Sequence, residues 1–189
     1  MVYRVYVEKK PAFADEAKAL CTELREILQI RALKDVRIWN RYDVQGLTEE
    51  TFLYAVQTVL SEPAVDTCTF DAPDCKGAQM LCVEYLPGQF DQRADSAAEC
   101  IQLLCKGDRP LVKTAKVYLF YGELDQAGFS CIQKYLINPV EARQADPAPV
   151  ASLQATYPEP APIQTVEGFC AMDDLALEAL AQRLGLAMD

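Results

Sequence analysis

The sequence contains no histidine among its 189 residues. This absence excludes Ser-His-Asp and Cys-His catalysis, and it removes the commonest general base and the commonest metal ligand of proteins. The usual phosphate-binding motifs are missing as well, because neither G-x-x-x-x-G-K-[ST] nor G-x-G-x-x-G occurs. We therefore expect no catalytic residue, no bound cofactor and no metal site in this chain.

Positive charge and long apolar runs are also scarce. Lys and Arg number 18 against 28 Asp and Glu, so the net charge is −10, which opposes binding to nucleic acids and to anionic lipid. No apolar stretch reaches the roughly 18 to 20 residues that cross a bilayer. Residues 1–7 alternate polar and apolar side chains and lack the apolar block of a signal peptide. We expect a cytoplasmic protein with no nucleic-acid or membrane partner.

Cysteine is plentiful, with eight residues, but no C-x-x-C pair occurs. Several of the cysteines fall at apolar positions of expected helices and strands. We expect reduced, buried thiols rather than metal ligands or a disulfide framework.

The hydrophobic pattern predicts a strand–helix–strand–helix unit at the start of the chain. Residues 3–9 and 36–44 alternate as strands do. Residues 48–60 form a second helix, with Thr48 as its N-cap and Leu47 packed on Phe52. The first helix, residues 12–30, has apolar side chains at spacings of three and four on one face, namely Phe13, Ala17, Leu20, Leu24, Ile27 and Leu28.

The same order of elements recurs about 77 residues later. This offset carries Leu47 and Phe52 onto Leu124 and Phe129, and the cap Thr48 onto Asp125. The face of the first helix is carried onto Phe90, Ala94, Ala97, Ile101, Leu104 and Cys105. One such unit leaves a sheet face bare, so two units are expected to pack together, sheet to sheet or edge to edge. We predict an α+β fold for residues 1–145, a pseudo-twofold duplication with half-repeats of about 1–73 and 77–145.

The composition changes after residue 145. Residues 146–168 hold five of the eleven prolines and predict an extended, semi-rigid linker. Residues 169–189 predict one helix with an acidic start and Gly185 as its stop signal. The leucine face of this helix has only the first domain left to contact, so we interpret it as the first helix of a truncated linker domain.

One segment and one arginine are candidates for function. Pro87-Gly88 predicts a turn, and the polar side chains that follow lie at a helix N-terminus, where backbone N–H groups attract anions. They serve either as caps and intramolecular contacts or as an interface or ligand contact. For Arg41 the alternatives are an interface and a solvated strand edge. The candidate interface residues are Gln89, Asp91, Gln92, Arg93, Asp95, Ser96 and Arg41.

Five segments together carry a family resemblance: residues 2–10, 40–44, 84–97, 135–143 and 185–189. With them the chain resembles the N-terminal part of large single-chain phosphoribosylformylglycinamidine synthase. This resemblance implies a domain similar to a dimer of the small PurS subunit, which agrees with the duplication. The segment of residues 87–93 departs from the Pro-Gly-Thr-Ile-Ser-Pro-Trp pattern of one branch, so contacts known in that branch do not carry over.

The resemblance also implies a function that belongs to the parent enzyme. Such enzymes are ligases that convert formylglycinamide ribonucleotide to formylglycinamidine ribonucleotide with glutamine, ATP and Mg²⁺, in purine biosynthesis. The partners of this domain would be the synthetase core, linker and glutaminase domains of the parent chain. We expect it to serve domain docking and assembly of the ammonia path, and to be inactive alone. The alternative is a free-standing adaptor or small-ligand-binding module.

Overall fold

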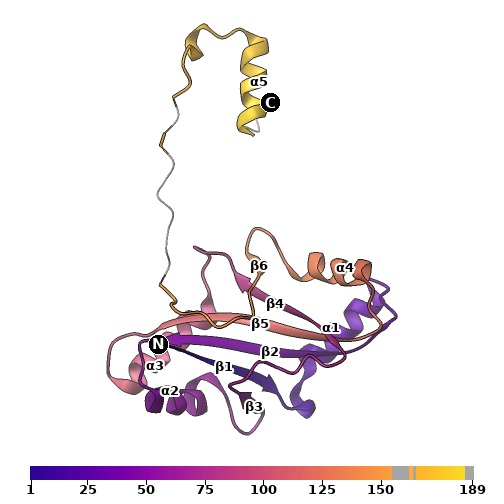
Figure 1. The fold of residues 1–189 in the computed structure, drawn as a ribbon, viewed down its shortest axis with the longest axis vertical. Coiled ribbons are helices and arrows are strands. Elements are labelled where there is room, and N and C mark those ends of the chain that lie inside the picture. Colours follow the sequence, from indigo (N-terminus) through magenta and orange to yellow (C-terminus); the bar gives the residue numbers. More distant parts are fainter. Residues whose placement is uncertain (155–161, 164, 186–189) are drawn as a thin grey trace. The chain divides into compact units, whose positions relative to one another are not determined.

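A computed structural model describes residues 1–154, 162–163 and 165–185. The chain divides into two compact units, Met1–Ala155 and Thr156–Asp189. The first unit is mixed α+β with a six-stranded antiparallel sheet (Figure 1). Its elements, in chain order, are β1 (Val2–Lys9), α1 (Asp15–Glu26), β2 (Leu33–Gln45), α2 (Glu49–Ala55), β3 (Asp66–Thr69), β4 (Ala78–Tyr85), α3 (Gln92–Cys105), β5 (Leu111–Gly122), α4 (Gln126–Leu136) and β6 (Ala142–Gln144).

The strand order across the sheet is β3-β1-β2-β5-β4-β6. The two longest strands, β2 and β5, pair at the centre, where Trp39 lies opposite Val117 and Asn40 opposite Lys116. The shortest strands, β3 with four residues and β6 with three, form the two edges. Of the two packing alternatives for residues 1–73 and 77–145, the structure has the edge-to-edge one, because both segments contribute strands to a single sheet.

Helices α1 to α4 cover one face of the sheet in two groups. Helices α1 and α4 share a core over Val36, Ile38 and Phe120. Helices α2 and α3 share a second core over Val5 and Val44. Each core combines a helix from the first half of the chain with one from the second half. The two halves therefore depend on each other for burial of their apolar side chains.

The opposite face, here called the helix-free face, is covered by two connecting segments. Residues 70–77 link β3 to β4, and these strands lie on opposite sides of β1, β2 and β5, so the segment has to cross the sheet. Residues 145–153, here called the strap, follow β6. The apolar side chains buried on this face are Tyr6, Trp39, Cys82, Ala115, Val117 and Leu119, together with Ala145 of the strap itself.

Several local predictions are confirmed. Thr48 accepts a hydrogen bond from the Thr51 N–H and caps α2. Asp125, its predicted equivalent, accepts from the Gly128 N–H and caps α4. Strands β1 and β2 span the predicted segments and extend them at their ends.

Other local predictions are wrong. The first helix starts only at Asp15, because Pro11–Phe13 form a separate 3₁₀ turn, and it stops at Glu26, earlier than predicted. Phe13 and Ile27 therefore lie outside the helix and are exposed. In the second half Phe90 is 70% exposed, and Cys105 is exposed as well. The apolar spacing predicted that these four residues belong to the core. Phe13, Ile27 and Phe90 lie outside the α-helices, and Cys105 is the last residue of α3, so none of the four is buried.

The prediction of buried thiols holds only for part of the cysteines. All eight are free, but only Cys21 and Cys82 are buried. Exposed thiols occur at Cys100, Cys105, Cys131 and Cys170. A small side chain at an apolar position does not ensure burial, since α3 and α4 each present only one face to the sheet.

Gly122 is a position where glycine is required. It ends β5 with φ +140°, and a Cβ there would lie 2.1 Å from the Ala32 carbonyl oxygen. We expect Gly122→Ala to lower the free energy of unfolding by at least about 2 kcal/mol, because the backbone cannot retreat without breaking the β2–β5 pairing. Chemical denaturation followed by circular dichroism measures this loss.

The matched control is Gly107→Ala. A Cβ at Gly107 would meet no atom closer than 3.9 Å, the Cys105 carbonyl oxygen, so the expected change is under about 0.5 kcal/mol. Equal effects of the two substitutions would contradict the steric explanation.

The second unit contains a short 3₁₀ turn, Phe169–Ala171, and helix α5 (Asp174–Leu184). Asp173 caps α5 by accepting a hydrogen bond from the Ala176 N–H, and Gly185 ends it in a left-handed conformation. The predicted helix and its stop signal are thus confirmed. Among the described residues, every helix is too short or too polar to span a membrane.

Candidate functional site

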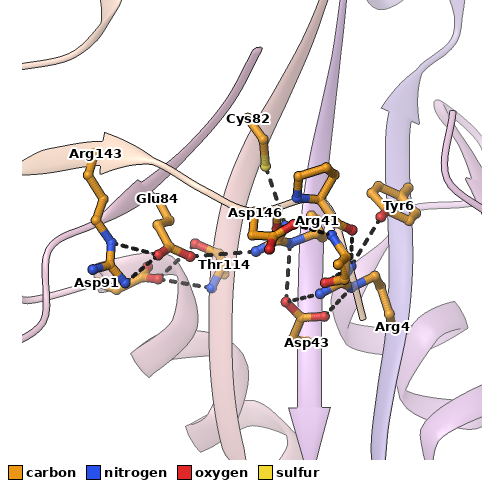
Figure 2. A network of polar contacts seen from close by, with 12 residues as sticks. Arg4, Tyr6, Arg41, Asp43, Cys82, Glu84, Asp91, Thr114, Arg143 and Asp146 are labelled. Carbon is orange, nitrogen blue, oxygen red and sulfur yellow. Dashed lines mark hydrogen bonds and ion pairs between the residues drawn. The ribbon is translucent and has the colours of Figure 1, made fainter. Parts of the chain in front are cut away.

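The helix-free face carries a buried network of charged side chains (Figure 2). At its centre Asp43, on β2, lies between Arg4 and Arg41. Its Oδ2 lies 3.2 Å from Arg4 Nη2 and 3.1 Å from Arg41 Nε. Asp43 is 2% and Arg41 3% exposed. The alternation of side chains along β1 and β2 brings these three residues to the same face, because Arg4 pairs directly with Asp43 across the two strands.

The two arginines also hold the strap by its main chain. Arg4 Nη1 donates to the carbonyl oxygens of Pro147 and Ala148, at 2.7 and 3.0 Å. Arg41 Nη1 donates to the carbonyl oxygen of Asp146 at 3.0 Å. Carbonyl oxygens thus complete the coordination of guanidinium groups that a single carboxylate cannot satisfy.

On the same face, the network continues across the sheet toward β4 and β6. Glu84 on β4 lies 3.6 Å from Arg41 and 2.7 Å from Arg143 on β6. Arg41 Nη1 also contacts the sulfur of Cys82 at 3.4 Å. Burial raises the pKa of the Cys82 thiol, so this sulfur stays protonated near neutral pH and is a poor nucleophile. The arrangement is suited to fixing the strap in place rather than to covalent chemistry.

The opposite, helix-bearing face has a hollow over the middle of the sheet, here called the central groove. Its volume is about 710 Å³, within the range of small-molecule sites. The floor is formed by β2, β5 and β4, and the walls by α3 and the end of α4. Residues that line it include Asn40, Tyr42, Arg93, Ser96, Lys116 and Asn138.

The predicted segment of residues 89–96 contributes to this groove in part. Gln92, Arg93 and Ser96 line it. Asp91 caps α3 by accepting from the Ala94 N–H at 2.9 Å, and Asp95 forms an ion pair with Arg109. The capping interpretation is thus confirmed for Asp91.

Two more contacts anchor the same segment to the sheet and to a neighbouring loop. The second oxygen of Asp91 accepts from the N–H and hydroxyl of Thr114, at 3.1 and 2.8 Å. The side-chain amide of Gln89 donates to the Val140 carbonyl oxygen at 3.1 Å. The interface role of residues 89–96 stays a prediction.

Arg41 does not join the other candidate residues. It lies on the helix-free face, whereas Gln92, Arg93 and Ser96 lie on the helix-bearing face. The alternative of a solvated strand edge for Arg41 is wrong, because β2 is a central strand and the strap covers this side chain.

Sequence reasoning missed Arg4, Asp43 and Glu84 as members of the network. A signal was present: Arg4, Arg41 and Asp43 are charged side chains at alternate positions of two predicted strands, where like positions share a face. The burial of that face was not visible, since it depends on segments that lack any periodicity.

Among the described residues, no group of three or more cysteine and acidic side chains is arranged to hold a metal ion. Comparison of the sequence with models of known protein families and with characterised proteins finds no match. The site is therefore interpreted from its own geometry.

Proposed function

We propose that this chain is the N-terminal, non-catalytic domain of a phosphoribosylformylglycinamidine synthase, and that it serves docking between the synthetase core and the glutaminase. The observation that carries the proposal is the repeated element order, strand–helix–strand–helix–strand. If β1, β2 and β3 are matched with β4, β5 and β6, the strand order of the sheet is the same counted from either edge. This supports a duplicated, PurS-like domain, in which one chain provides what two subunits provide elsewhere.

The register at the centre of the sheet adds support for the duplication. With an offset of 77 residues, Trp39 is equivalent to Lys116 and Asn40 to Val117. These four residues form two adjacent cross-strand pairs, so a twofold axis with this offset would pass near the middle of both β2 and β5. The equivalent caps Thr48 and Asp125 agree with the same offset.

A docking role fits the chemistry of the described residues. The charged network of the helix-free face holds the strap in place. The buried thiol beside it, Cys82, has a raised pKa and is therefore a poor nucleophile. In this proposal ATP and Mg²⁺ act in the synthetase core, and the ammonia path is assembled from the parent chain. Residues 89–96, with the exposed Phe90 among them, form the candidate contact to that core.

A direct test is to sequence the gene beyond the codon for Asp189. We expect an open reading frame that encodes a synthetase core and a glutaminase. A stop codon at this point would overturn the proposal and favour the alternative, a free-standing adaptor or ligand-binding module. The central groove is the observation that favours that alternative.

The docking role has its own test in the full enzyme. We expect Phe90→Asp to lower glutamine-dependent synthesis at least about fivefold relative to ammonia-dependent synthesis, because a charge in the contact weakens coupling of the two domains by about 1 kcal/mol or more. The side chain is 70% exposed, so the stability of the domain should not change. Steady-state rates with each nitrogen source measure the ratio.

The matched control is Phe13→Asp, at the equivalent position of the first half. Phe13 is 50% exposed and lies outside the candidate segment, so the ratio of the two rates should stay at the wild-type value. A ratio unaffected by Phe90→Asp would refute residues 89–96 as the contact.

A further inference from the structure

The sheet has two corners where the chain passes from a strand into the turn before a helix. The first corner consists of residues 9–13 and 63–66. Here Lys9 lies opposite Asp66 in the pairing of β1 with β3. The next residue, Lys10, donates its main-chain N–H to the Val65 carbonyl oxygen at 2.8 Å. These contacts join the end of β1 to the segment that precedes β3.

The second corner, residues 85–90 and 139–142, repeats the same main-chain contacts in the other half. Tyr85 lies opposite Ala142 in the pairing of β4 with β6. The Leu86 N–H donates to the Glu141 carbonyl oxygen at 2.9 Å. Each of these residues follows its counterpart by 76 positions, one fewer than at the helix caps. The two corners thus share these backbone contacts, so their side chains can be compared position by position.

The side chains of the first corner are mostly polar and are satisfied within the domain. Lys9 forms an ion pair with Asp66 at 2.8 Å. The ammonium group of Lys10 donates to the carbonyl oxygens of Pro63 and Ala64, at 2.8 and 3.0 Å. The exposed large apolar side chain of this corner is Phe13, at 50%. A surface of this kind needs no partner to cover it.

The same positions of the second corner are apolar. Tyr85 and Leu86 replace the two lysines, and Val140 replaces Ala64. Tyr85 is 48%, Phe90 70% and Val140 71% exposed. Together they expose roughly 300 Å² of side-chain surface, since a large aromatic side chain has about 150 to 250 Å². Apolar patches of this size are often functional in monomeric proteins. The fold does not require this one, because the first corner makes the same main-chain contacts with lysines.

One side-chain contact joins this patch to the candidate contact of residues 89–96. The side-chain amide of Gln89 donates to the Val140 carbonyl oxygen at 3.1 Å, which holds the loop before β6 beside the start of α3. We propose that the second corner docks apolar side chains of the synthetase core of the same chain, with Tyr85, Phe90 and Val140 as its contact residues. This inference rests on the proposed function and extends the contact to the end of β4 and to the loop before β6.

The size of the patch favours a tethered partner over a second copy of this chain. Stable complexes of separate proteins bury about 800 Å² on each partner, more than twice what the second corner exposes. A domain linked to it in one chain needs a smaller contact, because the linker keeps its effective concentration high.

The test measures the exposure of these side chains by hydroxyl-radical oxidation and mass spectrometry, in the full parent enzyme and in the 189-residue chain. We expect Phe90 and Tyr85 to be oxidised at least threefold more slowly in the parent enzyme, and Phe13 at the same rate in both. Equal rates for Phe90 and Tyr85 would overturn the proposal, and so would equal protection of Phe13. Protection that appears in the 189-residue chain as its concentration rises would assign the corner to a second copy instead.

The variant Val140→Asp assigns the protection to the second corner. In the parent enzyme it should return the oxidation of Phe90 to the rate of the 189-residue chain, because a carboxylate is costly to bury in an apolar contact. The matched control is Ala64→Asp, at the equivalent position of the first corner, and it should leave the protection of Phe90 unchanged. Both side chains are exposed, so both variants should fold. Full protection of Phe90 in Val140→Asp would contradict the proposal.

The outcomes are distinct from those that test the proposed function. A reading frame that encodes a synthetase core, together with equal oxidation of Phe90 in the two proteins, would overturn the docking surface and leave the proposed function in place. A stop codon after Asp189 would overturn both.

Discussion

Replacing Asp43 by asparagine is expected to lower the free energy of unfolding by about 3 to 5 kcal/mol. Asp43 is the carboxylate between Arg4 and Arg41, and it is 2% exposed. Asparagine keeps the shape but removes the charge, which leaves the buried guanidinium group of Arg41 without its nearest counter-ion. Urea unfolding of the full chain, followed by far-ultraviolet circular dichroism, measures the loss.

The control for this substitution is Asp15→Asn. Asp15 is highly exposed and pairs with Lys18 one turn along α1, 3.3 Å away. Exposed pairs of this kind contribute under about 1 kcal/mol. A loss for Asp43→Asn as small as that of the control would mean that the network adds little to stability and that water replaces the carboxylate.

The second large effect is expected at Phe120. Its side chain is fully buried in the core shared by α1 and α4. Its ring stacks on Tyr118 at a centroid distance of 6.0 Å and meets the ring of Phe129 at 6.2 Å, edge to face. Phe120→Ala should cost about 3 to 5 kcal/mol, through lost burial and the cavity that remains. The same unfolding experiment applies.

Phe90→Ala is the comparison for Phe120→Ala. Because Phe90 is mostly exposed, its truncation should change the free energy of unfolding by no more than about 0.5 kcal/mol. If Phe120→Ala cost less than about 1 kcal/mol, the tight packing of this core would be disproved.

Local chemistry explains what could be predicted from the sequence. The strand and helix periods identify β1, β2 and α2, and the capping chemistry of Thr48 and Asp125 places the starts of α2 and α4. Edge strands β3 and β6 were missed because four and three residues are too few to show an alternation. Hydrophobic periodicity can be recognised only within one element, so it gives no signal where a strand is as short as these.

The partners of each helix could not be predicted in this way. An apolar face shows that α1 is buried, but it does not show that α1 packs beside α4 rather than α2. That choice follows from the strand order, which depends on contacts between residues far apart in the chain. The exposure of Phe13 has a local cause, since Pro11 starts a separate turn before α1.

Only part of the candidate site could be predicted, because the rest depends on contacts between residues far apart in the chain. Polar residues beside a helix start, such as Asp91 and Arg93, follow from local rules. The burial of Arg41 follows from the strap, whose residues have no period and which holds this side chain through the main-chain carbonyl oxygen of Asp146. Such contacts cannot be predicted from a sequence pattern, because any residue type can supply a main-chain carbonyl oxygen.

The strand lengths fall from the centre of the sheet to its rim, and this limits growth of the sheet by other molecules. An edge strand offers unpaired N–H and C=O groups to any passing strand, and a long one recruits more of them. Here the rim offers four residues of β3 and three of β6. A half of this chain by itself would instead present the thirteen residues of β2. Joining the halves therefore protects the protein from strand-by-strand aggregation, at the place where each half is most vulnerable.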